Sequence, residues 1–251
     1  MKTKKKNKEA NRPFVFSNFA MTADGKIAFA NREFVPFGSE RDREHMMELR
    51  AAADAVMAGA RTVETPGVTL GPGGEKFQRL RRRRGLADCH LRIIVSGNGS
   101  ISPSAEIFKR RFSPIIVLAS GAISEGRLRR LRGAADAIKV FGETEIDFPA
   151  ALRWLHEEWK VQCLLCEGGG GLHGSLIRAR LLDELHLTIC PQIFGGRSAP
   201  TIADGGVVLK LSQAVPFELK SAKPVGDELF TVFHAPKSLD FRQLFTARRL
   251  R

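Results

Sequence analysis

A run of four glycines behind a short apolar stretch is the part of this sequence best suited to chemistry. Val161 to Cys166 is apolar, Glu167 follows, and Gly168, Gly169, Gly170 and Gly171 lead into an apolar-patterned segment at Leu172. The apolar run predicts a buried strand, and the segment from Leu172 predicts a helix. Glycines let a ligand approach the backbone, and free N–H groups at a helix start favour an anion. The pattern therefore indicates a phosphate-binding loop.

The same glycines do not form a Rossmann fingerprint. Gly169, Gly171 and Gly174 match G-x-G-x-x-G, but they lie two-thirds along the chain instead of after its first strand. The next acids, Asp183 and Glu184, open a strand, whereas the fingerprint needs an acid at a strand end. We interpret the stretch as the nucleotide-binding loop of another fold. A glycine turn made only for close packing is the alternative.

Metal and hydrolytic sites find little support. His156 and Glu158, followed by Cys163 and Cys166, imitate a zinc deaminase pattern, but five residues from Glu158 to Cys163 is too short a spacing. Residues three apart in a strand also face opposite sides, so no metal site is expected. His173 adjoins the glycine loop, and its contact with a ligand is a hypothesis. The other histidines are expected on a helix (His45) or at surface and strand-end positions (His90, His156, His186, His234).

Alternating strands and helices must position these residues. The order predicts an α/β domain with a mostly parallel sheet and antiparallel additions. Expected strands are 14–21, 54–59, 91–96, 114–119, 137–141, 161–166, 183–190, 217–219 and 228–234. The first expected helix is capped by Ser39 and runs to about Ala53. Others are expected over 124–131, over 148–159 and from Leu172. The helix over 148–159 is indicated by the apolar stripe Phe148, Leu152, Leu155 and Trp159.

Residues 64–90 are expected to form a long loop, because Pro66-Gly67, the 71–74 turn and the arginines of 79–84 lack a core period. Those arginines either bind a substrate phosphate or form a solvated basic surface. Both interpretations remain open at this point.

The charge of +13 on 251 residues is concentrated at the ends of the chain. Residues 1–12 carry six Lys/Arg and one Glu, and residues 237–251 carry five Lys/Arg and one Asp. We expect two basic tails around one domain, residues 13–236. Such tails are more often solvated than functional, so nucleic-acid binding is not favoured. No apolar run approaches the roughly 18 residues of a membrane span, and no secretory signal is expected. Cysteines in apolar runs fit buried thiols in a reducing, cytoplasmic compartment.

Motifs along the chain resemble one enzyme family when they are taken in order. They are Asn18-Phe-Ala-Met-Thr22-Ala-Asp24-Gly25-Lys26, Leu49-Arg50-Ala51, Asp54-Ala-Val-Met-Ala-Gly59 followed by Thr62-Val63, Glu167-Gly-Gly-Gly170, and Ile193-Phe-Gly-Gly196. Together they resemble the reductase of riboflavin biosynthesis. This reductase is the C-terminal half of the bacterial bifunctional deaminase/reductase, or the stand-alone diaminohydroxyphosphoribosylaminopyrimidine reductase. The resemblance covers about residues 13–235.

The resemblance implies a dihydrofolate-reductase-like fold, NADPH as cofactor and a homodimer. The implied reaction reduces the ribosyl group of a 5-phosphoribosylamino-pyrimidine to ribityl, with hydride going to C1′ of the ring-opened imine. The substrate is 5-amino-6-(5-phosphoribosylamino)uracil or its 2,5-diamino precursor. The cofactor supplies the hydride, and the protein orients the two partners.

Positions matching the family's motifs give the candidate site residues. Cofactor-binding positions are Gly59, Thr62, Gly168, Gly169, Gly170, Gly171 and Leu172. Substrate-binding positions are Asn18, Thr22 and Arg50, and the candidate proton donors are Asp24 and Glu167. Asp24 could instead be only a turn residue, and Arg50 only a helix cap. Glu167 is harder to dismiss, because a carboxylate at that place is costly to bury without a partner.

The sequence departs from the family at two places. Glu64-Thr65-Pro66-Gly67 stands where Asp-Asp-Pro is usual, and Ser96-Gly97 stands where Asp-Ser is usual. The first departure bears on substrate identity, the second on cofactor contacts. A reductase of a different pterin-like or pyrimidine substrate is therefore an alternative. A nucleic-acid-binding protein that uses its basic tails on an inactive scaffold is a third hypothesis.

Overall fold

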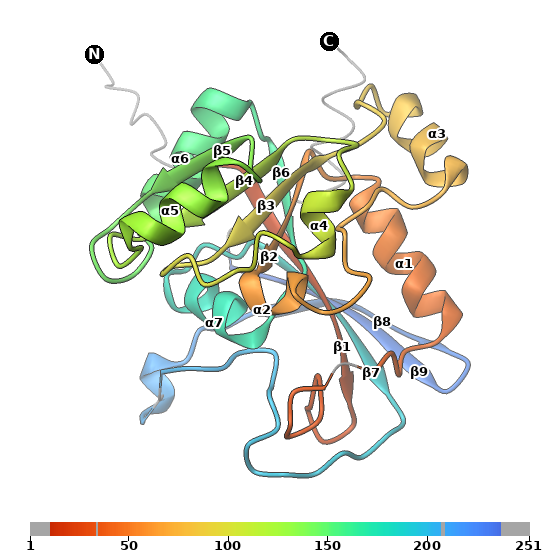
Figure 1. Cartoon of the computed structure of the whole chain (residues 1–251). Coiled ribbons are helices and arrows are strands. Elements are labelled where there is room, and N and C mark those ends of the chain that lie inside the picture. Colours follow the sequence, from red (N-terminus) through yellow and green to blue (C-terminus); the bar gives the residue numbers. More distant parts are fainter. Residues whose placement is uncertain (1–10, 34, 207–208, 237–251) are drawn as a thin grey trace, which may run out of the picture.

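A single mixed sheet forms the centre of the computed structural model, which describes residues 11–33, 35–206 and 209–236 (Figure 1). The strand order is β5-β4-β3-β2-β6-β1-β7-β9-β8. From β5 to β7 neighbouring strands pair in parallel, while β9 pairs antiparallel with both β7 and β8. The strands are β1 (Phe14–Thr22), β2 (Ala55–Gly59), β3 (Leu91–Val95), β4 (Ile115–Ala119), β5 (Ala137–Val140), β6 (Cys163–Cys166), β7 (Glu184–Cys190), β8 (Glu218–Val225) and β9 (Glu228–His234).

Helices cover both faces of the parallel strands, which explains why those strands are apolar on both sides. The helices are α1 (Glu40–Arg50), α2 (Ala60–Val63), α3 (Glu75–Arg83), α4 (Glu106–Lys109), α5 (Glu125–Arg132), α6 (Phe148–Trp159) and α7 (Gly170–Arg178), with a 3₁₀ turn at Leu211–Gln213. Residues of α6 and α7 pack in one core cluster, and residues of α1, α2, α4 and α5 pack in the other (Figure 1). The expected α/β fold is confirmed.

In the strands from β1 to β6, successive apolar residues alternate between the two clusters, as a period of two requires. Val15 and Met57 belong to the α6–α7 side, while Phe16 and Val56 belong to the other. Cys166 and Cys163 likewise lie on opposite sides, as expected. Among the described residues, no group of His, Cys, Asp or Glu is arranged to hold a metal ion.

The return of the chain to the middle of the sheet places the candidate site. The chain adds β3, β4 and β5 in turn on one side of β2, and it then returns to form β6 between β2 and β1. Cys166 pairs in register with both Ser17 and Met57. The residues that follow these three positions therefore meet at one edge. Ligands of open α/β sheets bind outside the carboxyl ends of the strands, at such a reversal.

Residues 64–90 correct the expectation of a loop without secondary structure. They contain the nine-residue helix α3, and the arginines in its last turn differ in their exposure to solvent. Arg81 is 1% exposed and its guanidinium donates to the carbonyl oxygens of Arg50, Ala53 and Ala87 at 2.6–2.9 Å. Arg81 therefore holds the end of α1 and serves neither of the two roles left open for it.

Other expectations need smaller corrections. α1 ends at Arg50 and not near Ala53, while α4 was not anticipated. His90 and His186 are buried, against the expectation of surface or strand-end positions. Arg12, assigned to the basic tail, forms a bidentate ion pair with Asp183 at 2.7 Å. Residues 1–10 and 237–251, the rest of the two tails, lie outside the described residues. No helix of the described ranges has the length and apolar character to cross a membrane.

Replacing Arg81 with Ala is expected to destabilise the protein by about 3 kcal/mol, because carbonyl oxygens at the end of α1 lose a charged donor in a buried place. Chemical denaturation measures the change. Arg83→Ala, on the same helix but exposed, is the matched control and should shift the unfolding free energy by less than about 0.5 kcal/mol. Equal effects of the two substitutions would contradict this account.

Candidate active site

A cleft of about 1760 Å³ opens along the carboxyl ends of β1, β2 and β6. Its walls are α1, the start of α7, and the segments 36–39, 65–73 and 144–149. Most of the candidate residues line it: Asn18, Arg50, Gly59, Thr62, Glu167, Gly168, Gly169, Gly170, Gly171 and Leu172. The cleft is large enough for a dinucleotide and a second small molecule, given that pockets for one drug-sized ligand span about 300–1,000 Å³.

Arg50 and Glu167 form a buried ion pair between two walls of the cleft. The Arg50 Nε and Nη2 atoms donate to the two carboxylate oxygens of Glu167, both at 2.6 Å, and the side chains are 10% and 7% exposed. Arg50 Nη1 donates to the Gly71 carbonyl oxygen at 2.7 Å. A buried ion pair is stable when its remaining donors are satisfied, as they are here. The pair thus joins α1, the end of β6 and the 65–73 segment.

The turn of the glycine loop is built for close backbone approach. Gly59 N–H donates to the Gly168 carbonyl oxygen at 2.9 Å, tying the end of β2 to the loop. Gly168 has φ +110°, a conformation that residues with a Cβ rarely adopt, and its peptide bond to Gly169 is cis. Gly169 is the N-cap of α7 and offers no side chain to the helix start. The N–H groups that begin α7 are therefore available to an anion in the cleft.

Gly170 and Gly171 differ in the space around them. A Cβ on Gly170 would stand 2.2 Å from the Thr201 carbonyl oxygen, and the Gly170 carbonyl accepts from Asp204 N–H at 3.0 Å. A Cβ on Gly171 would meet nothing within 4 Å. Gly170 is thus required by packing against 201–204, whereas Gly171 leaves room at the cleft surface. This cradle fits the phosphate groups of a nicotinamide dinucleotide.

Thr22, a predicted substrate-binding residue, and Asp24, a predicted proton donor, are not among the residues that line the cleft. The Thr22 hydroxyl donates to Asp24 Oδ1 at 2.5 Å, and the Asp24 carboxylate accepts from the N–H groups of Phe194 and Gly195 at 3.2 and 2.8 Å. The Thr22 hydrogen bond, followed by these backbone donors, lowers the pKa of Asp24. Asp24 clamps the 193–196 turn to the end of β1 and is poorly suited to donate a proton.

His173 is a core residue. Its Nε2 lies 2.9 Å from the Ser17 hydroxyl and its Nδ1 lies 2.6 Å from the Ile202 carbonyl oxygen, with the side chain fully buried. A carbonyl only accepts, so Nδ1 carries the proton and Nε2 accepts from Ser17. Burial lowers the pKa of His173 to about 4. His173 does not line the cleft, so the geometry does not favour the hypothesis of ligand contact.

The inner face of α1 contributes site residues that the sequence analysis missed. Asp42, Met46 and Arg50 line the cleft at i, i+4 and i+8, and Arg43 lies beside them. That helical spacing, counted back from Arg50, was the available signal. Arg61 also lines the cleft; it is exposed and has no polar partner in the described part of the chain.

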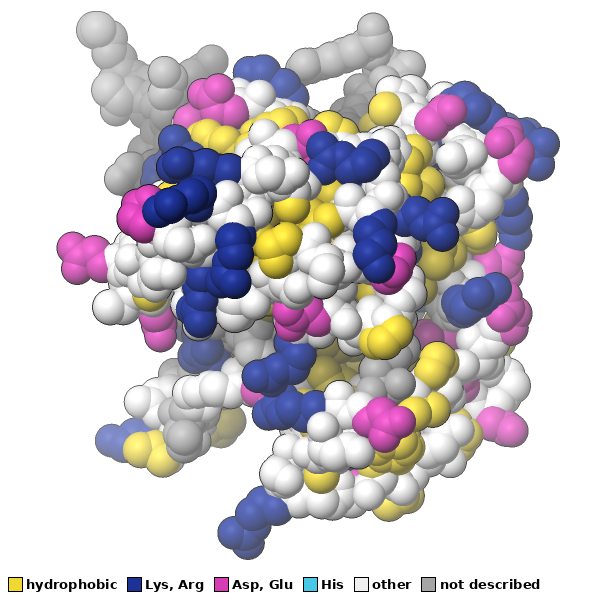
Figure 2. All heavy atoms as spheres, viewed as in Figure 1, with side chains coloured by type: hydrophobic (Ala, Val, Ile, Leu, Met, Phe, Trp, Pro, Cys, Tyr) yellow, Lys and Arg dark blue, Asp and Glu magenta, His cyan; other side chains and the backbone are white. Residues whose placement is uncertain are grey.

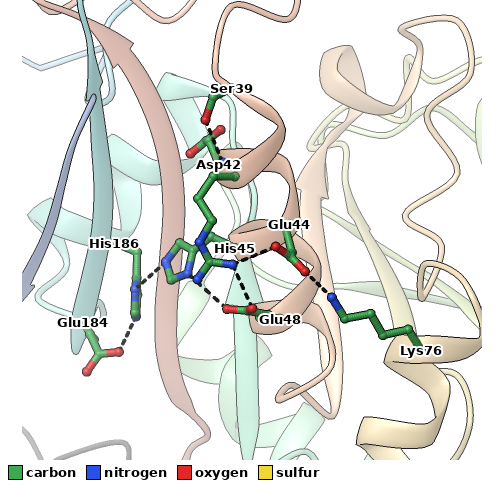
Figure 3. Close-up of polar contacts among 9 residues, drawn as sticks. Ser39, Asp42, Glu44, His45, Glu48, Lys76, Glu184 and His186 are labelled. Carbon is green, nitrogen blue, oxygen red and sulfur yellow. Dashed lines mark hydrogen bonds and ion pairs between the residues drawn. The ribbon is translucent and has the colours of Figure 1, made fainter. Parts of the chain in front are cut away.

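α1 is fixed in place by polar contacts on both sides (Figure 3). Toward the sheet, His45 Nε2 lies 3.2 Å from His186 Nδ1, and His186 Nε2 lies 2.6 Å from Glu184. Toward α3, Glu44 pairs with Lys76. Burial, followed by the neighbouring His186, lowers the pKa of His45 to about 4, so His45 is neutral above mildly acidic pH. The helix that carries Asp42 and Arg50 is thus held at both faces.

Comparison with known proteins agrees with this architecture. Residues 13–231 match the family model of the RibD C-terminal domain. The chain belongs to this family. It is similar to the 2,5-diamino-6-ribosylamino-4(3H)-pyrimidinone 5′-phosphate reductases of Archaeoglobus fulgidus (33% identity, 79% of this chain and 90% of the relative) and Methanothermobacter thermautotrophicus (32%, 88% and 98%).

The fold agrees with a solved structure as well. A pyrimidine reductase-like protein from Corynebacterium diphtheriae superposes with a TM-score of 0.73 at 19% identity, covering 91% of this chain and 94% of that chain. Members of the family are reductases, so the chain is an oxidoreductase of the type found in riboflavin biosynthesis, and the family implies a nicotinamide cofactor.

Gly170→Ala is expected to destabilise the protein by more than about 2 kcal/mol, because the new Cβ overlaps backbone at Thr201. Gly171→Ala is the matched control and should be neutral or stabilising by up to about 1 kcal/mol, since Ala favours a helix over Gly and the space is open. Thermal unfolding of both variants decides. If Gly170→Ala is tolerated as well as Gly171→Ala, the close packing of the loop on 201–204 is wrong.

Proposed function

We propose that the protein is an NADPH-dependent reductase of riboflavin biosynthesis that reduces the ribosyl group of 2,5-diamino-6-ribosylamino-4(3H)-pyrimidinone 5′-phosphate to ribityl. The observation that carries the proposal is one continuous cleft, which joins an anion-binding helix start at α7 to the paired Arg50 and Glu167. The names of the relatives at 33% and 32% identity support the substrate. The uracil form, already deaminated, is the second substrate to test.

The two ends of the cleft have different tasks. Gly59, Thr62 and the segment from Gly168 to Leu172 bind the cofactor, with the start of α7 on its phosphates. Asn18, Arg50 and Glu167 hold the substrate against it. Bound NADPH supplies a hydride to the substrate C1′; the protein contributes proximity and orientation. Thr22 and Asp24 support this indirectly, by holding the loop after β1.

Arg43 offers a counter-charge for the substrate phosphate. It lies on the cleft wall one helical turn before Met46 and Met47, and its partner, Glu40, is an exposed residue at 3.0 Å. An exposed ion pair contributes little and exchanges readily for a phosphate. The phosphate of the ribosyl group would then lie at the mouth of the cleft, with the sugar further inside.

The departure from the Asp-Asp-Pro motif keeps one alternative open. The Glu64 carboxylate accepts from Ser102 N–H at 2.9 Å, which turns it from the cleft, while Thr65, Pro66 and Gly67 line the cleft. No carboxylate of this segment thus lies at the cleft. A reductase acting on another pterin-like or pyrimidine substrate is the alternative that this feature favours.

A second copy of the chain and a cytoplasmic location complete the proposal. β8 is an edge strand whose Leu219 and Val225 are 58% and 41% exposed, a surface suited to a homodimer. The thiols of Cys163, Cys166 and Cys190 are buried and free, in keeping with a reducing compartment. On the viewed face Lys and Arg occur in separate groups, with Asp and Glu among them (Figure 2). The nucleic-acid hypothesis concerns the basic tails, of which residues 1–10 and 237–251 lie outside the described residues.

NADPH oxidation with the 2,5-diamino substrate is expected to exceed oxidation with its deaminated form at equal concentrations. NADPH should also stabilise the folded protein by about 2.7 kcal/mol when its concentration is a hundredfold above its dissociation constant. NADH at the same concentration should stabilise the protein less. Absence of a shift with both nucleotides would refute the cofactor, and oxidation with neither pyrimidine would refute the substrate.

Glu167→Gln should lower kcat/KM more than tenfold and destabilise the protein by about 3 kcal/mol, because Arg50 loses its charge partner in a buried place. Glu106→Gln, which disrupts only an exposed pair with Lys109, is the control and should behave as wild type. Steady-state kinetics and chemical denaturation report the two effects. Wild-type kinetics in Glu167→Gln would remove Glu167 from the site.

A further inference from the structure

One carboxyl group on the cleft wall lacks both a cation and a backbone N–H partner and also lies on α1, the helix that carries Arg43 and Arg50: Asp42. The other carboxyls that line the cleft in the described ranges are engaged or distant. Glu40 pairs with Arg43, Glu167 with Arg50, Asp204 accepts from Thr201, Asp147 accepts from Ala150 N–H, and Glu145 is exposed on the segment after β5, at the far edge of the sheet. Asp42 is half-buried in the first turn of α1 (Figure 3).

The surroundings of Asp42 are unfavourable to a negative charge. Its Oδ1 is shielded from solvent and has no hydrogen-bond partner. The groups that face it are the Thr188 hydroxyl and the Cys190 thiol of β7 and the Glu228 carboxylate of β9. Burial raises the pKa of Asp42, the charge of Glu228 raises it further, and only the Thr188 hydrogen bond opposes. Asp42 therefore holds a proton more readily than an ordinary aspartate.

Glu228 is itself held in place, so its charge acts on Asp42 from a fixed position. Its two carboxylate oxygens accept from the Ser39 N–H at 2.7 Å and the Ser39 hydroxyl at 2.6 Å. The Cys190 thiol donates to it at 3.5 Å. Burial raises the pKa of the Cys190 thiol to about 12, so the thiol stays neutral and adds no charge. Two carboxyl groups, Asp42 and Glu228, thus lie between α1 and β9, and of the two only Asp42 lines the cleft.

The proposed reduction consumes one proton. In the glycosylamine the C1′–O4′ bond breaks, its electron pair goes to O4′, and the nitrogen lone pair forms the C1′=N bond. O4′ must take a proton to leave as a hydroxyl. The hydride then adds to C1′ and the C=N electrons return to nitrogen, so the balance is substrate plus hydride plus one proton. Neither earlier candidate fits this step, because both oxygens of Glu167 accept from Arg50 and Asp24 lies outside the cleft.

We propose that Asp42 is the general acid that protonates O4′ as the sugar ring opens, and that Glu228 is a positioning residue whose fixed negative charge favours reprotonation of Asp42 from solvent. The inference rests on the proposed function. Once Asp42 has given up its proton, two carboxylates face each other, and their repulsion drives Asp42 to take a proton from solvent before the next turnover. General acid catalysis by one group contributes about 10²–10⁴-fold to the rate.

The test compares Asp42→Asn with wild type in pH profiles of kcat over the pH range in which both proteins stay folded, using NADPH and the 2,5-diamino substrate. Wild type should lose activity on the alkaline limb of the profile, above the pKa of Asp42, because the ionised carboxyl has no proton to donate. Asp42→Asn should lose about 100-fold in kcat and show no alkaline limb, while NADPH binding by fluorescence stays within twofold. Loss of less than threefold, or a large loss with an unchanged alkaline limb, overturns the proposal.

Glu228→Gln supplies an independent readout that holds even if Asp42→Asn does not fold. Removing the charge lowers the pKa of Asp42, so the alkaline limb should move to lower pH; an unmoved limb overturns the proposal. Asp227→Asn removes a charge from an exposed neighbour of Glu228 and is the matched control, with a wild-type profile expected. Wild type that binds NADPH but reduces neither pyrimidine would instead overturn the proposed function, and this inference with it.

Discussion

The bidentate pair between Arg50 and Glu167 is the contact on which the geometry of the cleft depends. Arg50 ends α1, Glu167 directly follows β6, and the Gly71 carbonyl oxygen of the intervening segment accepts from the remaining donor of Arg50. Both side chains are almost fully buried, so loss of either one would leave an uncompensated charge in a region of low dielectric. The energetic requirement to keep the pair intact fixes the distance between α1 and the glycine loop, which begins one residue after Glu167.

This constraint is extended by a second set of buried contacts around α1. Arg81 of α3 donates to the carbonyl oxygens that end α1, and His45 contacts His186 from its middle. A helix held at its end, at its middle and by Ser39 at its start has little freedom to move. The residues on its inner face, from Asp42 to Arg50, are therefore presented to the cleft as a rigid wall. Rigid support of this kind is what precise orientation of two reactants needs.

The opposite wall of the cleft, formed by the glycine loop and the start of α7, is held in place by backbone packing and not by charge. Gly168 has a positive φ that residues with a Cβ rarely adopt, and Gly170 packs against the Thr201 carbonyl oxygen. The Gly59 N–H donates to the Gly168 carbonyl oxygen of the loop. None of these contacts uses a side chain, which leaves the start of α7 without an internal cap. A cleft with one wall of oriented N–H groups and one of charged side chains can separate the phosphates of a cofactor from a polar substrate.

Local pattern determined a large part of this protein. The strand Phe14–Thr22, the capped start of α1, the amphipathic stripe of α6 and the glycine loop were predictable, because each is set by residues within a few positions of one another. The resemblance of ordered motifs likewise assigned Arg50 and Glu167 to the candidate site. The tertiary structure decided what spacing along the chain cannot encode. Arg81 became a core residue and Asp24 a clamp, because the carbonyl and N–H groups they bond lie on segments brought together only by folding. Asp42 faces Glu228 across 186 positions, since β9 returns beside β7 under α1, and burial together with this long-range encounter of two carboxyl groups raises the pKa of Asp42.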